Sequence, residues 1–449
     1  MTVKTPILDF VRRYAKDDTL RLHMPGHKGV GALGIEGLDI TEIEGADSLY
    51  EAEGIIRESE QNASDLFGAH TYYSTEGSSQ CIRAMLLLAV KYAKEQGKKP
   101  TVAIGRNAHR SALTAAALLD IDPVWITPKT DNYLACPIDA DVLREMFETA
   151  EQKPTAVYIT SPDYLGNTLP LSELARVCHD NGALLLVDNA HGAYLKFLDP
   201  SRHPIDMGAD MCCDSAHKTL PVLTGGAYLH LSKECDAAFG NQAKHALAIF
   251  GSTSPSYLIL QSLDRANAYL ETCGEKLAAF LRQVDVLKAA LREHGYSLFG
   301  NEPLKLTLAA KPYGYSGTAL AETLVRQGLI PEFADADYLV LMLTPELGGE
   351  GLKRLEAALL AIPSRAPLAD DAPVFRAGKR VMSIREAMLS CAETVPVSES
   401  EGRVLAVPTV GCPPAVPIVV CGERIDLHAI RCFAYYGIRE CCVVKGGRL

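Results

Sequence analysis

The stretch Ala183-Leu-Leu-Leu-Val-Asp188 decides the fold class of this chain of 449 residues. Its apolar residues do not alternate with polar ones, which is typical of a strand whose two faces are both covered. Other short apolar runs lie before and after it, and amphipathic helical stretches separate them. This alternation predicts an α/β fold with a mostly parallel sheet. We expect strands at 101–104, 123–126, 156–160, 183–188, 209–213 and 226–231, and helices at 78–94, 109–119, 141–150 and 171–181.

The pattern changes in the second half of the chain. A long helical region at 256–294 leads to a smaller α+β unit at 296–362, and a linker rich in Pro, Ala and Asp follows at 363–373. The tail then shows one helix, 383–391, and a Pro-rich turn, 411–417. These features predict an N-terminal segment (1–69), a large domain (70–250), a linker helix with a small α+β domain (251–365) and a tail domain (366–449).

The composition restricts the classes of partner. Hydrophobic residues make up 48% of the chain, which is ordinary for a globular protein. No apolar run reaches membrane-spanning length, so a membrane protein is not expected. A net charge of −11 disfavours nucleic acid as a partner. The chain starts without a secretory signal pattern, and its 13 cysteines form no C-x-x-C motif. We therefore expect a cytoplasmic protein with reduced thiols and no metal site, because no Cys/His cluster has ligand spacing.

Two polar segments at the carboxyl ends of predicted elements suit a flat, anionic ligand, since that edge of an α/β sheet is where ligands bind. Gly77-Ser-Ser79 begins a helix, where backbone N–H groups and hydroxyls can bind an anion, although an ordinary serine N-cap explains it as well. Asp188 ends its strand, where a carboxylate can keep a ring nitrogen protonated or can simply cap the turn. His191 nearby reads equally well as a hydrogen-bonded core histidine.

Two further segments carry reactive side chains. Lys218, in Asp214-Ser-Ala-His-Lys-Thr-Leu220, suits imine formation if burial and positive neighbours lower its pKa; the alternative is a solvated surface lysine. Arg106-Asn-Ala-His109 offers an imidazole that can stack on an aromatic ring and an arginine that can bind phosphate or carboxylate. The alternative there is a helix N-terminus capped by Asn107. The Arg106–His109 segment alone does not separate its alternatives, whereas the Met-Cys-Cys strand before Lys218 and Gly225-Gly226 after it oppose a solvated surface lysine.

The order and spacing of these segments resemble the layout of fold type I enzymes that use pyridoxal 5′-phosphate (PLP). The motifs His23-Met-Pro-Gly-His-Lys-Gly29, Glu53-Gly-Ile-Ile-Arg-Glu58, Arg106–His109 and Ser215-Ala-His-Lys-Thr-Leu-Pro221 make the chain similar to the Orn/Lys/Arg decarboxylase family in its short form. The resemblance covers nearly all of the chain. It implies an aspartate aminotransferase-like large domain with a mostly parallel seven-stranded sheet, and a smaller α+β C-terminal domain.

The resemblance also implies a role for each matching residue. Lys218 would hold PLP as a Schiff base, Asp188 would pair with the pyridinium nitrogen, and His109 would stack on the ring. Either Lys218 or His217 would return the proton to Cα, so the implied catalytic residues are Lys218, Asp188, His109 and His217. The implied cofactor-binding residues are Lys218, Gly77, Ser78, Ser79, His109, Asp188, Ala190, Ser215 and His217.

The activity implied by the family is decarboxylation of an amino acid, with a basic one (arginine, lysine or ornithine) as substrate and an amine and CO₂ as products. Such a lyase would serve amino-acid metabolism or polyamine biosynthesis, and by analogy it would be a homodimer or a higher even oligomer. The alternatives are another PLP reaction on the same fold, such as transamination or a different lyase reaction, and a PLP-binding regulator without catalysis.

The chain departs from the family where substrate would be selected. Glu76 stands where the family has an amide before its Gly-Ser, and it is expected to point away from the phosphate, toward the substrate. Val407 and Cys412 stand where the family has an acid and an aromatic residue, which puts the basic substrate in doubt. Glu332 and Asp335 match the family's Glu-x-Ala-Asp and are candidate partners for the substrate's distal cation. They read equally well as polar residues at the start of a strand.

Overall fold

A computed structural model describes residues 3–448 apart from 131, 370–371 and 411–415. The chain forms two compact units, each assembled from two separate stretches. The first unit comprises Met1–Pro100 with Cys178–Leu277, and the second comprises Thr101–Val177 with Ala278–Leu449. The four domain ranges expected from the sequence stay a prediction.

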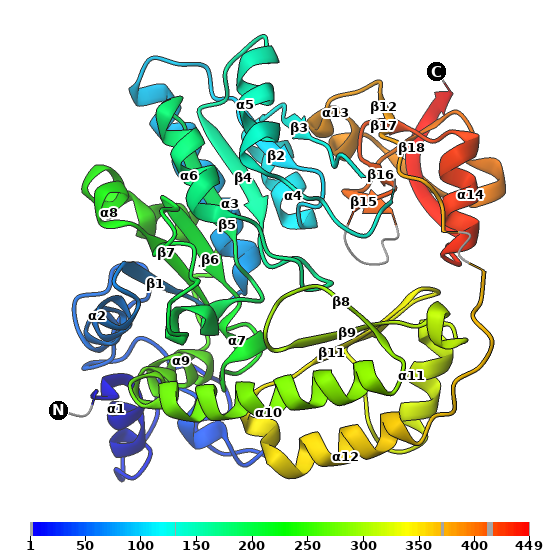
Figure 1. The fold of residues 1–449 in the computed structure, drawn as a ribbon. Helices are drawn as coiled ribbons and strands as arrows, with labels where there is room; N and C mark the ends of the chain where they lie inside the picture. Colours follow the sequence, from blue (N-terminus) through cyan, green and yellow to red (C-terminus); the bar gives the residue numbers. More distant parts are fainter. Residues whose placement is uncertain (1–2, 131, 370–371, 411–415, 449) are drawn as a thin grey trace. The chain divides into compact units, whose positions relative to one another are not determined.

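A seven-stranded sheet carries the chemistry-bearing segments, in the order β1-β7-β6-β5-β4-β2-β3. Strand β5 is parallel to β6, and β2 is parallel to both β3 and β4, whereas β7 runs antiparallel to β1 and β6. The expectation of a mostly parallel sheet is therefore confirmed (Figure 1). The bounds are β1 His70–Ser74, β2 Val102–Gly105, β3 Val124–Ile126, β4 Ala156–Thr160, β5 Leu184–Asp188, β6 Met211–Asp214 and β7 Ala227–Leu231.

Burial explains which strands the sequence reveals. Every residue of β5, β6 and β7 is buried, so these strands are uninterrupted apolar runs with few exceptions. Strand β1 reads His-Thr-Tyr-Tyr-Ser and has an exposed first residue, because it forms an edge of the sheet. The search for short apolar runs therefore did not predict β1, because the strand contains mostly polar residues.

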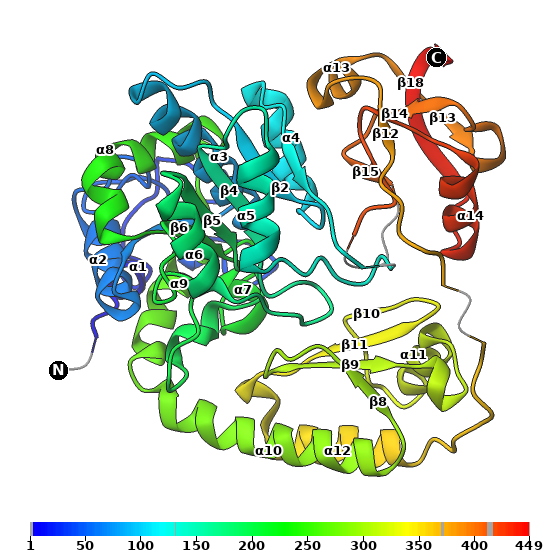
Figure 2. The ribbon, with the colours of Figure 1, turned by 45° about the horizontal axis from the view of Figure 1, so that its top comes forward.

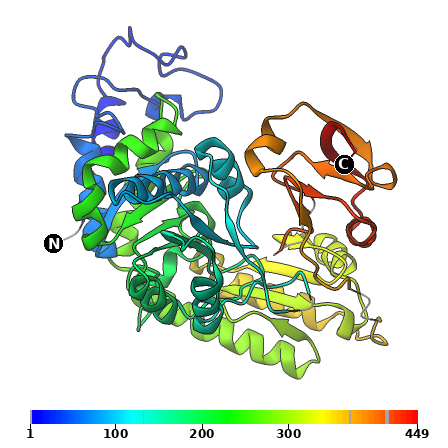
Figure 3. The same cartoon turned by 90° about the horizontal axis from the view of Figure 1, so that it is seen from above.

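The helices of the first unit cover its strands and position their ends. Helix α8 was not predicted, because Gly240 and the polar residues beside it interrupt its apolar pattern. The long helical region expected at 256–294 is two helices, separated at Glu271–Thr272. Between α1 and α2 the chain runs through a long loop that holds only the short 3-10 helix η1 (dark blue in Figure 3). The bounds are α1 Pro6–Tyr14, η1 Glu36–Leu38, α2 Ile55–Phe67, α3 Ser78–Glu95, η2 Ala193–Phe197, α7 Ala216–Thr219, α8 Lys233–Ile249, α9 Tyr257–Leu270 and α10 Cys273–Glu293, the last of which continues into the second unit.

Among the described residues, the second unit adds three smaller sheets that the sequence predicted only in part. One is antiparallel, in the order β10-β11-β9-β8, and another lies in the tail, in the order β12-β17-β14-β18-β13 (Figure 2). The third pairs β15 with β16. The tail strands β12 and β14 are short, and β13 alternates between exposed and half-buried residues, so these strands lack a strong apolar signal. The bounds are α4 Arg110–Leu119, α5 Ala140–Thr149, α6 Leu171–Asp180, β8 Ser297–Phe299, β9 Lys305–Ala309, η3 Lys311–Tyr313, α11 Gly317–Val325, β10 Phe333–Ala334, β11 Tyr338–Met342, η4 Pro345–Leu347, α12 Gly348–Leu360, β12 Lys379–Arg380, α13 Ile384–Leu389, β13 Ala392–Pro396, η5 Val397–Glu399, β14 Arg403–Leu405, β15 Thr409–Val410, β16 Val419–Val420, β17 Glu423–Arg424, α14 Leu427–Tyr435 and β18 Glu440–Arg448.

Within the described residues, none of the helices combines the length and the apolar character that a membrane crossing requires.

Candidate active site

The carboxyl end of β5 places Asp188 in the interior of the first unit, where its side chain is 2% exposed. Its Oδ1 accepts a hydrogen bond from the backbone N–H of Ala190 at 3.2 Å and lies 3.8 Å from the thiol of Cys213. The turn-capping contact considered from the sequence is therefore present. This contact uses only part of the hydrogen-bonding capacity of the Asp188 carboxylate, which has about four lone-pair sites.

Lys218 lies in the short helix α7, directly after β6. Its side chain is half-buried, and its Nζ lies 3.1 Å from Nε2 of His191. His191, which is 6% exposed, follows β5 in the same turn as Asp188. The amine is therefore held against an imidazole rather than solvated. Sequence reasoning gave His191 no role toward Lys218, although its place three residues after Asp188 was the available signal.

The start of α3 provides an open anion site. Gly77 is its N-cap, with φ +72°, and the structure shows no side-chain cap at this helix end, so the serine-cap alternative does not hold. The hydroxyl of Ser215 donates to that of Ser78 at 2.8 Å, which joins the turn after β6 to the helix start. A Cβ at Gly77 would meet only the backbone N of Ser79, at 4.0 Å, so this side of the loop is unobstructed. Together these residues leave the helix N-terminus available to a phosphate.

The backbone of Gly226 engages one ring nitrogen of His217. Its Nδ1 donates to the backbone oxygen of Gly226 at 2.9 Å. Burial lowers the pKa of His217 below its usual value; the hydrogen bond to Gly226 opposes this shift and the nearby Lys218 adds to it. The ring is therefore neutral at neutral pH, with its proton on Nδ1.

Asp214 anchors the turn that carries Lys218. Its Oδ1 accepts from Nδ2 of Asn189 at 2.7 Å, and its Oδ2 lies 3.1 Å from Nε2 of His203 and 3.2 Å from Nε2 of His230. Burial alone would raise the pKa of Asp214, but the two histidines outweigh it and hold that pKa below its usual value. Because Asn189 follows Asp188, this contact fixes the end of β5 to the end of β6.

His109 belongs to the second unit, where it is the N-cap of α4 and accepts from the backbone N–H of Ser111 at 3.3 Å. The cap expected at Asn107 is thus supplied by His109, and its stacking on a cofactor ring stays a prediction. Arg106, in the same motif, donates through both Nη atoms to Glu423 at 2.7 and 2.8 Å. Both side chains are buried, so this guanidinium is paired with a carboxylate of the tail.

The candidate substrate residues occupy three different settings. Glu76 accepts a hydrogen bond from the backbone N–H of Ser252, and Glu332 is exposed and accepts from the hydroxyl of Tyr164 at 3.1 Å. Asp335 is buried, and its Oδ1 accepts from two backbone N–H groups of the β10–β11 turn at 2.8 and 2.6 Å. Burial raises the pKa of Asp335 to about 6. Val407 precedes β15, and Cys412 lies outside the described residues.

Comparisons with known proteins assign this site to a family. The family model described as Orn/Lys/Arg decarboxylase, major domain, matches residues 5–295, and the model of the family's C-terminal domain matches residues 377–440. The chain belongs to the Orn/Lys/Arg decarboxylase family. It is an amino-acid decarboxylase, a carboxy-lyase whose cofactor is PLP, as the motifs predicted.

Individual relatives agree with this assignment. The chain is 30% identical to the uncharacterized protein YaaO of Bacillus subtilis, over 96% of this chain and 93% of YaaO. It is 28% identical to an arginine decarboxylase of Halalkalibacterium halodurans, over 94% of this chain and 91% of that enzyme. The constitutive lysine decarboxylase of Escherichia coli has the same fold, with a TM-score of 0.76 and 18% identity over 99% of this chain and 82% of that one. The fold type I architecture expected from the sequence is confirmed.

The residues of the first unit fit a PLP cofactor. Lys218 supplies a half-buried amine, Asp188 a buried carboxylate, and α3 an N-terminus without a side-chain cap. The amine suits the carbonyl group of PLP, the carboxylate suits its ring nitrogen, and the helix N-terminus suits its phosphate.

Proposed function

We propose that this protein decarboxylates a basic amino acid, with arginine as the first candidate and lysine and ornithine after it. The observation that carries the catalytic part is the contact of Lys218 Nζ with His191, in the unit that also holds Asp188 and the open start of α3. Arginine is supported by four relatives named arginine decarboxylase that match 94–96% of the chain. The relatives named lysine decarboxylase match 50–60% of it, as does the biodegradative arginine decarboxylase of Escherichia coli, at 60%.

The proposed roles follow from the chemistry of each side chain. When bound, PLP supplies an electron sink for the electron pair that remains after CO₂ departs. Lys218 holds the cofactor covalently between turnovers, and Asp188 keeps the ring nitrogen protonated, which favours charge that develops only in the transition state. His109 would stack on one face of the cofactor ring, and Ala190 would contact the other. Gly77, Ser78, Ser79 and Ser215 would bind the phosphate, whereas the neutral ring of His217 has no N–H left for it, because its ring proton is donated to Gly226.

We assign the return of the proton to Cα to Lys218 rather than His217. His217 has its proton on Nδ1, which Gly226 occupies, and burial lowers its pKa, so it has no proton to give from Nε2 at neutral pH. Lys218, once released from the cofactor, carries protons on an amine that His191 orients at 3.1 Å. A general acid must hold its proton at the operating pH and reach the acceptor atom.

Glu332 is the acid that we propose for the substrate's distal cation. Its carboxylate is exposed and takes a hydrogen bond from Tyr164. The carboxylate of Asp335 instead serves the backbone of its turn, and that of Glu76 binds the backbone of Ser252. A guanidinium or ammonium group would gain most from the carboxylate that is least committed.

A homodimer or a higher even oligomer is also part of the proposal. The loop between α1 and α2 exposes four large apolar side chains by 79–83%: Leu20, Leu22, Val30 and Leu33. Apolar side chains gathered on one loop are typical of a contact surface, and a twofold assembly covers two copies at once. A cytoplasmic location and a role in polyamine biosynthesis stay predictions.

The function is tested with a panel of amino acids incubated with the PLP-loaded protein, in which CO₂ and the amine product are both measured. Arginine is expected to give CO₂ and agmatine in equal amounts, with lysine and ornithine slower. The matched control is the Lys218→Ala variant under the same conditions, which should release neither. Formation of a keto acid without CO₂, or CO₂ only from amino acids without a distal cation, would contradict the proposal.

Ser215→Ala is expected to weaken PLP binding about tenfold, because the variant loses one hydroxyl from the phosphate site and one hydrogen bond to Ser78. A hydrogen bond to a charged group contributes about 1.5–3 kcal/mol. Titration of the apoprotein with PLP, followed by fluorescence, measures the change. The exposed Ser254→Ala is the matched control and should bind PLP like the unaltered protein. Equal affinity of the two variants would exclude Ser215 from the phosphate site.

His191→Gln is expected to lower turnover about ten- to hundredfold, because Lys218 loses the imidazole that orients its amine. The shape of the profile of kcat against pH should also change, because the amine of Lys218 loses its hydrogen-bond partner. A purely structural His191 would lower the stability of the fold and leave the shape of that profile unchanged. The comparison of kcat–pH profiles therefore decides the role.

A further inference from the structure

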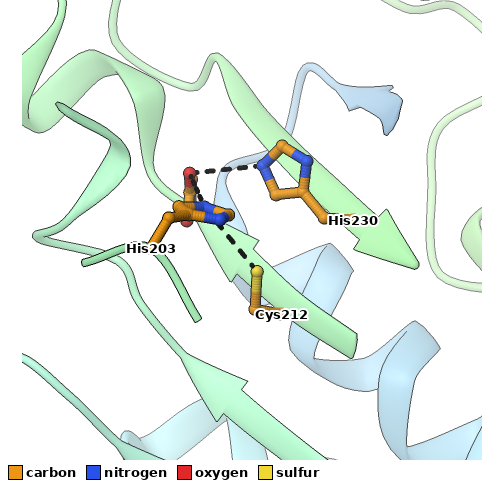
Figure 4. Close-up of side chains that lie close together, drawn as sticks. His203, Cys212 and His230 are labelled. Atoms are coloured by element: carbon orange, nitrogen blue, oxygen red, sulfur yellow. Dashed lines mark hydrogen bonds and ion pairs between the residues drawn. The ribbon is translucent and has the colours of Figure 1, made fainter. Parts of the chain in front are cut away.

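A second group of reactive side chains lies beneath the turn that carries Lys218, in the interior of the first unit. Two of its residues belong to β6, one to β7, and one to the loop after η2. Their ligand atoms all lie within 4.8 Å of one another, and all four residues are buried. Figure 4 shows the two imidazoles and the thiol turned toward a common centre. We call this group the buried quartet: His203, Cys212, Asp214 and His230.

We propose that the buried quartet binds one zinc ion. The distances support tetrahedral coordination, because Nε2 of His203 and Nε2 of His230 lie 3.1 and 3.2 Å from Oδ2 of Asp214. The Sγ of Cys212 lies 3.9 Å from Nε2 of His203. Zinc bonds of about 2.0–2.3 Å place neighbouring ligand atoms of a tetrahedron about 3.3–3.6 Å apart. The two N–O distances are slightly shorter and the S–N distance slightly longer than these values, and no two of the four ligand atoms are more than 4.8 Å apart. Zinc would draw the wider pairs together.

One oxygen of Asp214 faces two ring nitrogens, at 3.1 and 3.2 Å. These distances lie within the range of ordinary N–H···O hydrogen bonds, so they do not by themselves distinguish a proton from a metal ion. The three atoms nevertheless converge on one position, and a cation there would replace the two ring protons that now face a single oxygen.

The surroundings orient two of the ligands. Oγ1 of Thr71 lies 2.9 Å from Nδ1 of His230, which leaves Nε2 of that ring for the metal. Asn189 donates to Oδ1 of Asp214 at 2.7 Å, which leaves Oδ2 for it. Partners of this kind fix the tautomer and direction of metal ligands. Phe67 packs against both imidazoles, with ring centroids 5.5 and 4.5 Å away, and keeps the surroundings apolar.

The charges and the atom types of the four ligands favour zinc over other divalent ions. The carboxylate of Asp214 and a thiolate at Cys212 carry two negative charges, which one Zn²⁺ neutralises in a site without solvent. Binding breaks the S–H bond of Cys212 and forms a Zn–S bond, and the proton leaves to solvent. Two imidazoles, a thiolate and a carboxylate suit zinc better than calcium or magnesium, which prefer oxygen ligands. No metal was expected from the sequence, because these four ligands are not spaced as a local motif.

The ion would stabilise the turn that carries Lys218. Asp214 immediately precedes Ser215, and β6 and β7 are adjacent strands, so the quartet ties both strands to the loop at His203. Because its ligands are wholly buried, zinc would be acquired as the chain folds rather than by later entry.

The test is metal analysis of the full-length protein, expressed in zinc-supplemented medium and dialysed without chelator. We expect about one zinc per chain, and zinc-edge X-ray absorption should show one sulfur and three nitrogen or oxygen ligands. Cys212→Ser should lose the sulfur signal and at least about tenfold in zinc affinity, in line with the loss of a ligand. Cys391→Ser, which replaces an exposed thiol, is the matched control and should keep both.

Two results would overturn the proposal. Folded wild-type protein with no more zinc than its dialysis buffer would show that the quartet is held by hydrogen bonds alone. Bound zinc without a sulfur ligand, or a sulfur signal that survives in Cys212→Ser, would place the ion elsewhere. The wild-type measurement decides the question even if Cys212→Ser does not fold.

Discussion

Replacing Lys218 by alanine is expected to lower the rate of CO₂ release by at least about ten-thousandfold. The variant loses the amine that holds PLP, and with it the proposed proton donor to Cα. Both roles belong to one side chain, so a single substitution removes both contributions to the rate. The visible absorption of the bound cofactor should change as well, because the covalent link to the protein is gone. Single-turnover CO₂ assays and absorbance spectra measure the two effects on one sample.

The control for this variant is Lys233→Ala, which removes an exposed lysine from the same unit. It should retain both the rate and the spectrum of the unaltered protein. If Lys218→Ala released CO₂ at an undiminished rate, the site described around α7 would not be the catalytic one. Added methylamine distinguishes a lost amine from a damaged fold, since it restores part of the rate only in a folded site.

Asp188→Asn is the second change with a large effect, and it should reduce turnover about a hundred- to thousandfold while PLP stays bound. The amide has the shape of the carboxylate and keeps an oxygen that can accept from the N–H of Ala190, so the turn after β5 persists. It carries no charge, so the ring nitrogen is no longer held in its protonated form, and the developing negative charge loses its stabilisation. Measurement of kcat together with PLP content tests this directly.

Asp180→Asn, at the exposed end of α6, is the matched control for the loss of one charge in the first unit. It should leave kcat unchanged. A turnover of Asp188→Asn close to that of the control would reduce Asp188 to its turn-capping contact. Loss of PLP in place of a lower rate would instead assign the residue to cofactor binding.

The parallel strands could be predicted from the sequence because their burial on both faces is written as apolar runs. Strand β4 matches its prediction residue for residue, and β5 differs only at its first residue. Strand β1 could not be predicted this way, since an edge strand keeps polar residues. The tail strands β12, β14 and β17 could not either, because strands of two or three residues carry too little periodicity.

The reactive residues were predictable, but their partners were not. Lys218 and Asp188 stand out because each follows an apolar strand, whereas the contact between Lys218 and His191 depends on how two strand ends meet. The buried quartet shows the same limit. Its members are separated by up to 27 residues, from His203 to His230, and only the pairing of β6 with β7 brings them together. Sequence spacing detects local motifs, not groups assembled across a sheet.

The ion pair between Arg106 and Glu423 has a consequence for how this protein can be shortened or recombined. A version cut before the tail would keep the whole Arg106–His109 motif, yet it would leave a buried guanidinium without its counter-charge. Removing one partner of a buried pair costs about 3–5 kcal/mol, which is a large share of a typical domain's stability. A chimera that borrows its last seventy or so residues from a relative therefore folds well only if the donor also supplies an acid at this position. The tail and the Arg106–His109 motif therefore have to be transferred together.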